Sequence, residues 1–216
     1  MQHTHISAFD LDRTLIKGNA SFAFFLYLLK KGSVHLKGLL YSPFYFLRHR
    51  YFDMTLKQLH ESVFKRFLQG VSLPYLERHV DGFVKTKFER LCYEPALRRL
   101  REAQERGDYT MILSNSPHFL VGPIAAHLGV DEWKATEYGI DSGGHLSRIE
   151  SLFQGREKAL YLEGRGDELG VPRESITAYS DSHLDLPFLS AAGKAVVVNP
   201  DYRLRRASKR HAWEEI

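Results

Sequence analysis

Apolar residues recur at the three- and four-residue intervals of a helix through residues 17–89. The pattern predicts helices over residues 21–31, 34–48, 55–67 and 73–88. Gly32, Pro43, Gly70 and Pro74 interrupt it between these segments. We therefore expect an all-helical region soon after the first strand of the chain.

Outside that region, predicted strands alternate with predicted helices. The first strand precedes Asp10, and further strands are expected at residues 109–113, 135–140, 176–179 and 195–198. Helices are expected at residues 95–106, 117–128, 155–169 and 184–191, and in a basic tail. This order predicts an α/β fold, a doubly wound, mostly parallel, Rossmann-like sheet with an inserted helical cap, because parallel strands need crossover connections. The core would comprise residues 1–16 and 90–216, and the predicted cap residues 17–89.

Polar side chains follow three of the predicted strands at their carboxyl ends, where open α/β sheets bind ligands. They are Asp10 and Asp12, Ser114 and Asn115, and Asp181 and Asp185. Converging carboxylates repel one another, so they are tolerated together when a cation or a shared proton compensates them. A set of oxygen ligands favours Mg²⁺ over zinc or copper, and Mg²⁺ commonly binds a substrate phosphate as well.

These residues carry a family resemblance. The stretch from Asp10 to Leu15 resembles the DxDxT signature of haloacid dehalogenase (HAD) superfamily phosphatases. Ser114 in MILSNS resembles the second motif of that family, Lys158 in GREKA the third, and Asp181 with Asp185 in YSDSHLD the fourth. A helical insert just after the first motif is similar to the cap of subfamily IB, which includes the phosphoserine phosphatases.

The resemblance implies a Mg²⁺-dependent phosphomonoester hydrolase. Asp10 would attack phosphorus and form an aspartyl-phosphate, with Asp12 as general acid and base. Lys158 would supply a fixed positive charge. Phosphate-binding residues would be Thr14, Ser114, Asn115 and Lys158. Metal-binding residues would be Asp10, Asp12 through its backbone carbonyl, Asp181 and Asp185, the last by orienting metal-bound water or pairing with Lys158.

Each motif residue also has an ordinary structural interpretation. Asp10 and Asp12 could form a turn or cap a helix, since aspartate favours both positions. Ser114 could cap the helix expected near Pro117, which is compatible with phosphate binding at the same helix start. Lys158 by itself could lie on a solvated helix face. The order of the four motifs favours the catalytic interpretation for all of these residues.

Composition and charge exclude some classes of protein. The chain has 216 residues, of which 44% are hydrophobic, and its single cysteine, Cys92, rules out an internal disulfide. The N-terminus lacks the basic and apolar segments of a signal peptide, so we expect a cytoplasmic location. The formal net charge of +4 is partly collected in residues 30–50 and 203–210. We interpret this charge mainly as solvated surface, and we expect no nucleic-acid partner.

The predicted cap bears on the substrate. Its runs SFAFFLYLLKK and LKGLLYSPFYFLRHRYF are aromatic and basic-edged, and both are shorter than a membrane span. They would pack on the core or contact a membrane surface peripherally. Asn19 stands where phosphoserine phosphatases usually carry a glutamate, and Leu184 where they carry an asparagine. The YSDS form resembles bacterial phosphatidylglycerophosphate phosphatases, so small and lipid phosphate esters, and transfer to an alcohol instead of water, stay open.

Overall fold

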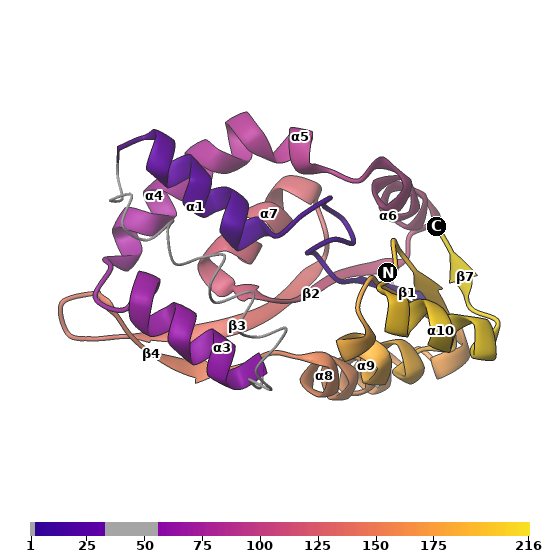
Figure 1. Ribbon diagram of the computed structural model, residues 1–216. Helices are drawn as coiled ribbons and strands as arrows, with labels where there is room; N and C mark the ends of the chain where they lie inside the picture. The colour runs from indigo at the N-terminus through magenta and orange to yellow at the C-terminus, as the bar shows by residue number, and fades with distance from the viewer. Residues whose placement is uncertain (1–2, 33–55) are drawn as a thin grey trace.

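The computed structural model describes residues 3–32 and 56–216 (Figure 1). In this part of the chain the strands are β1 (Ile6–Phe9), β2 (Tyr109–Pro117), β3 (Glu132–Ile140), β4 (Leu146–Ser151), β5 (Ile176–Ser180), β6 (Lys194–Val197) and β7 (Glu214–Glu215). The α-helices are α1 (Ala20–Lys30), α3 (Leu56–Val63), α4 (Leu73–Phe83), α5 (Glu89–Leu91), α6 (Glu94–Arg106), α7 (His118–Leu128), α8 (Gly155–Leu169), α9 (Leu186–Ala191) and α10 (Tyr202–His211). Short π-helical segments η2 (Phe64–Leu68) and η3 (Val84–Phe88) continue α3 and α4, and 3-10 turns form η4 (Arg173–Ser175) and η5 (His183–Asp185).

The strands form one sheet in the order β4-β3-β2-β1-β5-β6-β7. Each neighbouring pair is parallel except β3 and β4, which are antiparallel. β1 lies between β2 and β5, so their carboxyl ends meet at the middle of one sheet edge. This topology confirms the predicted α/β fold with a mostly parallel sheet.

Helices cover both faces of the sheet (Figure 1). On one face, Phe9 of β1 and Ile112 of β2 pack with apolar residues of α6 and α7. On the other face, Ile6 and Ala8 of β1 pack with residues of α8, α9 and α10. The apolar side chains of β1 therefore enter different cores on the two faces, which explains why the whole strand is buried.

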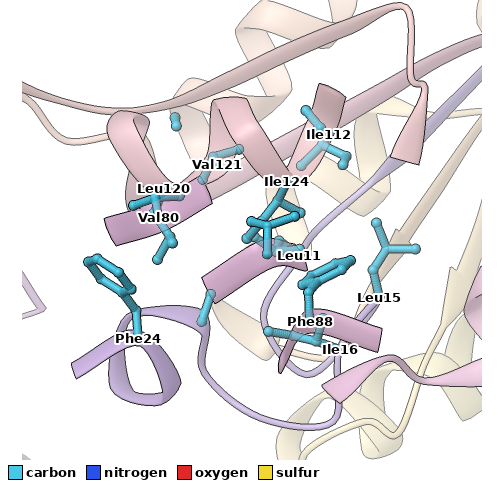
Figure 2. Packing of buried hydrophobic residues seen from close by; sticks show 14 of the residues in the cluster. Leu11, Leu15, Ile16, Phe24, Val80, Phe88, Ile112, Leu120, Val121 and Ile124 are labelled. Atoms are coloured by element: carbon cyan, nitrogen blue, oxygen red, sulfur yellow. The ribbon is translucent and has the colours of Figure 1, made fainter. Parts of the chain in front are cut away.

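The helices that follow β1 share the first of these cores (Figure 2). Phe24 of α1, Val80 of α4 and Phe88 of η3 are buried in the same cluster as Leu120 and Ile124 of α7. Within the predicted cap, α4 and η3 therefore pack against the sheet-bound helix α7 through an apolar interface. The division of the chain into a core and a cap at residues 17–89 stays a prediction.

The structure departs from the sequence-based elements in a few places. The expected helix over residues 34–48, with its aromatic and basic side chains, lies outside the described residues. The turn after β3 leads into β4, a strand that was not predicted because only Leu146 of its six residues is buried. Asp141 Oδ1 accepts hydrogen bonds from the backbone N–H groups of Gly143 and His145, which closes this hairpin. Within the described ranges, no helix is long and apolar enough to cross a membrane.

Candidate active site

The predicted motif residues come together where β1, β2 and β5 end. Asp10 and Asp12 follow β1, Ser114 lies near the end of β2, and the segment after β5 contributes Asp181 and Asp185. All five side chains are at least nine-tenths buried. The parallel pairing of these three strands explains the convergence, because it places their carboxyl ends at one edge.

Lys158 links two of the buried carboxylates. Its Nζ donates to Asp10 Oδ1 at 2.7 Å and to Asp185 Oδ2 at 2.8 Å, and only 2% of the lysine side chain is exposed. Ser180 Oγ also donates to Asp185 Oδ2, at 2.7 Å. Burial alone would lower the pKa of Lys158, but the two carboxylates raise it, so this lysine is a permanent cation. The solvated alternative for Lys158 is therefore excluded by its contacts.

The first turn of α8 fixes the position of Lys158. Gln154 and Glu157 form a reciprocal capping box at this helix start. Gly155 lies directly against the backbone of Leu184, and a Cβ at this position would stand 2.1 Å from the Leu184 carbonyl oxygen. The absent side chain lets α8 approach the segment that carries Asp181 and Asp185. The GREKA motif thus needs its glycine as well as its lysine.

Both oxygens of Asp12 are held by donors. The backbone N–H of Ala20, at the start of α1, donates to Oδ1 at 2.5 Å, and Ser116 Oγ donates to Oδ2 at 2.6 Å. Burial raises the pKa of Asp12, while these two hydrogen bonds oppose the rise. The side chain of Asp12 is thus fixed between the end of β2 and the first turn of α1.

Asp181 forms an ion pair with Arg13, whose Nε lies 3.3 Å from Asp181 Oδ2. The Arg13 side chain is 57% exposed, and its φ of 62° places its backbone in the left-handed region. Burial raises the pKa of Asp181 to about 7, although Arg13 opposes the rise. The backbone N–H of Asp201 donates to the Asp181 carbonyl oxygen at 2.9 Å, which ties this segment to the start of α10.

The three predicted phosphate-binding side chains other than Lys158 differ in their surroundings. Ser114 is buried, and its Oγ accepts from the backbone N–H of Ser116 at 3.1 Å instead of capping α7. Asn115 is partly buried. Thr14 is fully buried, and its Oγ1 has no hydrogen-bond partner among the described residues. The assignment of these three residues to phosphate stays a prediction.

The charges of this site fit a divalent cation. Its four carboxylates face two cations, Lys158 and Arg13, so two negative charges are uncompensated when all the groups are ionised. Burial raises the pKa of Asp10 well above its ordinary value, Lys158 opposes the rise, and the other carboxylates add to it. Among the described residues, no group of three or more acidic, histidine or cysteine side chains is placed to hold a metal ion by itself. Two carboxylates and a carbonyl, completed by water and substrate, are the donor set that suits Mg²⁺.

Sequence reasoning missed several residues that contact this site. Ser116 and Ser180 each donate to a motif aspartate, and Arg13 pairs with Asp181. All three stand within two residues of a motif position, but nothing in their spacing shows which way their side chains point. His183, between the motif residues Asp181 and Asp185, has its Nδ1 2.9 Å from Asp201 Oδ2.

Comparison with known proteins identifies the family. A model of haloacid dehalogenase-like hydrolases matches residues 8–190, which include every motif residue described above. The chain belongs to this HAD family. The family predicted from the four motifs is therefore confirmed.

Related HAD proteins include several named as phosphatases. A probable phosphatase of Mycobacterium tuberculosis is 28% identical over 212 residues, covering 95% of this chain and 72% of that protein. A histidinol-phosphatase of Neisseria meningitidis is 27% identical over 233 residues, covering 97% of this chain and 96% of that protein. These names support the prediction that the chain is an enzyme of the phosphatase class.

Solved structures show the same fold. A protein of unknown function from Bordetella pertussis has a TM-score of 0.84 at 22% identity, covering 99% of this chain and 98% of that chain. A substrate-bound phosphoserine phosphatase has a TM-score of 0.69 at 17% identity, covering 95% of this chain and 91% of that chain. At these identities the likeness establishes the HAD fold alone.

Proposed function

We propose that this protein is a Mg²⁺-dependent phosphomonoester hydrolase that works through an aspartyl-phosphate on Asp10. The buried contact of Lys158 with both Asp10 and Asp185 carries the proposal. A buried cation between two carboxylates at the edge of a parallel sheet is costly for stability and is suited to holding a nucleophile. The site lies next to the start of α8, which carries Lys158. A relative of this chain is named a probable phosphatase, which also supports the proposal.

In the first step, Asp10 attacks the substrate phosphorus. Lys158 holds Oδ1, so Oδ2 would form the new bond to phosphorus while the bond from phosphorus to the leaving oxygen breaks. Asp12, in its protonated form, donates its proton to that oxygen, and the alcohol departs. The raised pKa of Asp12 favours the protonated form that this step needs.

In the second step, water attacks phosphorus and the bond to Asp10 breaks. Asp12 is now ionised and takes one proton from the attacking water, which releases inorganic phosphate and restores both aspartates. Lys158 stays charged throughout, so it offsets negative charge on Asp10 before attack and on the phosphoryl group afterwards. Ser180 keeps Asp185 in place beside the lysine.

The residues that would hold Mg²⁺ are Asp10, Asp181 and the backbone carbonyl of Asp12. When bound, the ion supplies positive charge that stabilises the phosphoryl oxygens and the ionised carboxylates. Asp181 must be ionised to serve as a ligand, and Arg13 favours its ionised form. Asp185 is already occupied by Lys158 and Ser180, so its contribution would be to orient the lysine.

Substrate selection is assigned to the predicted cap. Asn19 stands in the position of a phosphoserine phosphatase glutamate, but its Oδ1 accepts from the backbone N–H of Phe22 at 2.8 Å and so caps α1. This role favours a phosphate ester other than phosphoserine. The histidinol-phosphatase that matches along almost its entire length makes histidinol phosphate the first substrate to test.

The test measures release of inorganic phosphate from p-nitrophenyl phosphate by the full chain. We expect activity with Mg²⁺, loss of that activity with EDTA, and loss in Asp10→Asn. Activity that survives both changes would refute the proposal. A second assay, with histidinol phosphate, phosphoserine and a phosphatidylglycerophosphate in parallel, would rank the substrate classes. Adding acceptor alcohols and analysing the products would distinguish hydrolysis from phosphotransfer.

A further inference from the structure

Ser116 is a buried serine two residues after the motif residue Ser114, at the point where β2 leads into α7. It is 3% exposed. Its Oγ donates to Asp12 Oδ2 at 2.6 Å and lies 3.2 Å from the Oγ of Ser21 on α1. It therefore connects the end of a sheet strand, the side chain of Asp12 and the first turn of α1.

The contacts of Asp12 come from two separate elements. Ala20, on α1, holds one carboxyl oxygen, and Ser116, on β2, holds the other. A carboxyl group held at one oxygen can still rotate about its Cβ–Cγ bond, because that torsion is soft. Donors at both oxygens fix the plane of the group. Ser116 is the donor that comes from a side chain and can be removed by substitution.

We propose that Ser116 is a positioning residue that orients Asp12 for proton transfer to the leaving oxygen. The inference rests on the proposed function, in which Asp12 is the general acid. Ser116 itself exchanges no proton with the substrate. It holds the carboxyl plane, so that the proton of Asp12 meets the leaving oxygen as its bond to phosphorus breaks. Small errors in the placement of a catalytic group reduce rate strongly, which is why one hydrogen bond can matter here.

A merely structural role for Ser116 makes a different prediction. A serine that only satisfies a buried polar contact would, when replaced, lower stability and reduce activity on all substrates alike. A serine that positions the general acid matters in proportion to how much the leaving group needs a proton. Phenol is a much weaker acid than p-nitrophenol, so phenyl phosphate depends on Asp12 far more than p-nitrophenyl phosphate does.

The experiment compares kcat/KM for phenyl phosphate and p-nitrophenyl phosphate in the full chain with Mg²⁺. General acid–base catalysis is worth about 10²–10⁴-fold. We therefore expect Ser116→Ala to lose about tenfold or more on phenyl phosphate and less than about threefold on p-nitrophenyl phosphate. Ser116→Thr, which keeps the hydroxyl, is expected to restore the wild-type ratio of the two substrates.

A matched control comes from β1. Ser7 is also buried, and its Oγ donates to an aspartate, Asp108, at 2.8 Å. Ser7→Ala is expected to leave the ratio of the two kcat/KM values unchanged. If Ser116→Ala does not fold by circular dichroism, Ser21→Ala removes the neighbouring hydroxyl and is expected to show a smaller loss of the same selective kind.

The outcomes separate this inference from the proposed function. A wild-type protein that hydrolyses neither ester refutes the proposed function. A wild-type protein that hydrolyses both, with Ser116→Ala losing the same factor on each or losing nothing, refutes the positioning role alone. If Ser116→Ala cannot be tested, an unchanged substrate ratio in Ser21→Ala refutes it equally.

Discussion

Asp181 allows a direct measurement of the charge imbalance in the site. Burial raises its pKa from 3.8 to about 7, so keeping this carboxylate ionised in the metal-free protein lowers the free energy of unfolding. A difference of this size corresponds to about 4 kcal/mol, because each pKa unit is worth about 1.4 kcal/mol. Asp181→Asn removes the charge at almost constant volume. We expect it to stabilise the metal-free protein at pH 8 by up to about 4 kcal/mol.

The sign follows from proton binding. Between about pH 4 and pH 7, the folded protein keeps a proton on Asp181 that the unfolded chain has lost, so the free energy of unfolding falls as pH rises through this window. The raised pKa values of Asp10 and Asp12 act in the same direction. The advantage of Asp181→Asn should therefore shrink to about 1.5 kcal/mol at pH 5.

Urea denaturation in EDTA, followed by circular dichroism at pH 5 and pH 8, measures both differences. Arg13→Ala is the control of opposite sign, because it removes the cation that favours ionised Asp181. Its expected loss is below about 1 kcal/mol, since the Arg13 side chain is more than half exposed. Saturating Mg²⁺ should stabilise the wild type by about 2–3 kcal/mol at 100 times its Kd, and Asp181→Asn much less. A metal-free Asp181→Asn protein that is no more stable than wild type at pH 8 would refute the reasoning.

Two further substitutions test how Lys158 is placed and compensated. Gly155→Ala forces a Cβ against the Leu184 backbone and is expected to destabilise the protein by about 1–3 kcal/mol and to reduce activity. Gly164→Ala, in the same helix with open space around it, should instead stabilise it by about 0.5–1 kcal/mol. Lys158→Met leaves two buried carboxylates without their cation and is expected to cost about 3–5 kcal/mol. Lys134→Met, which breaks an exposed pair, should cost less than about 1 kcal/mol. Urea denaturation measures the change in stability of each variant. Equal changes for Gly155→Ala and Gly164→Ala, or for Lys158→Met and Lys134→Met, would contradict this description of the site.

The sequence predicts the positions of the motifs well because chain order and strand direction decide them. Asp10 and Asp181 follow strands that are neighbours in a parallel sheet, so their approach needs no knowledge of side-chain rotamers. Lys158 lies in the first turn of the helix that the sequence predicts over residues 155–169 and the structure contains as α8. The fold class and the edge where the site lies follow from the same information.

Side-chain direction is what the sequence does not contain. Nothing in the spacing of SNSP indicates that Ser116, and not Asn115, donates to Asp12. The pairing of Arg13 with Asp181 depends on a left-handed backbone at Arg13, which sequence patterns do not predict for arginine. The short strand β4 was missed because five of its six residues are not buried, and its place is set by the hairpin with β3 and not by an alternating pattern of its own.

The proposed mechanism requires that Asp10 becomes covalently phosphorylated during turnover. Rapid acid quenching of the full chain mixed with p-nitrophenyl phosphate and Mg²⁺, followed by peptide mass analysis, tests it directly. We expect the mass of one phosphoryl group on the peptide that contains Asp10, and none in Asp10→Asn. Phosphate release by the wild type with no phosphorylated Asp10 peptide at any quench time would contradict the account.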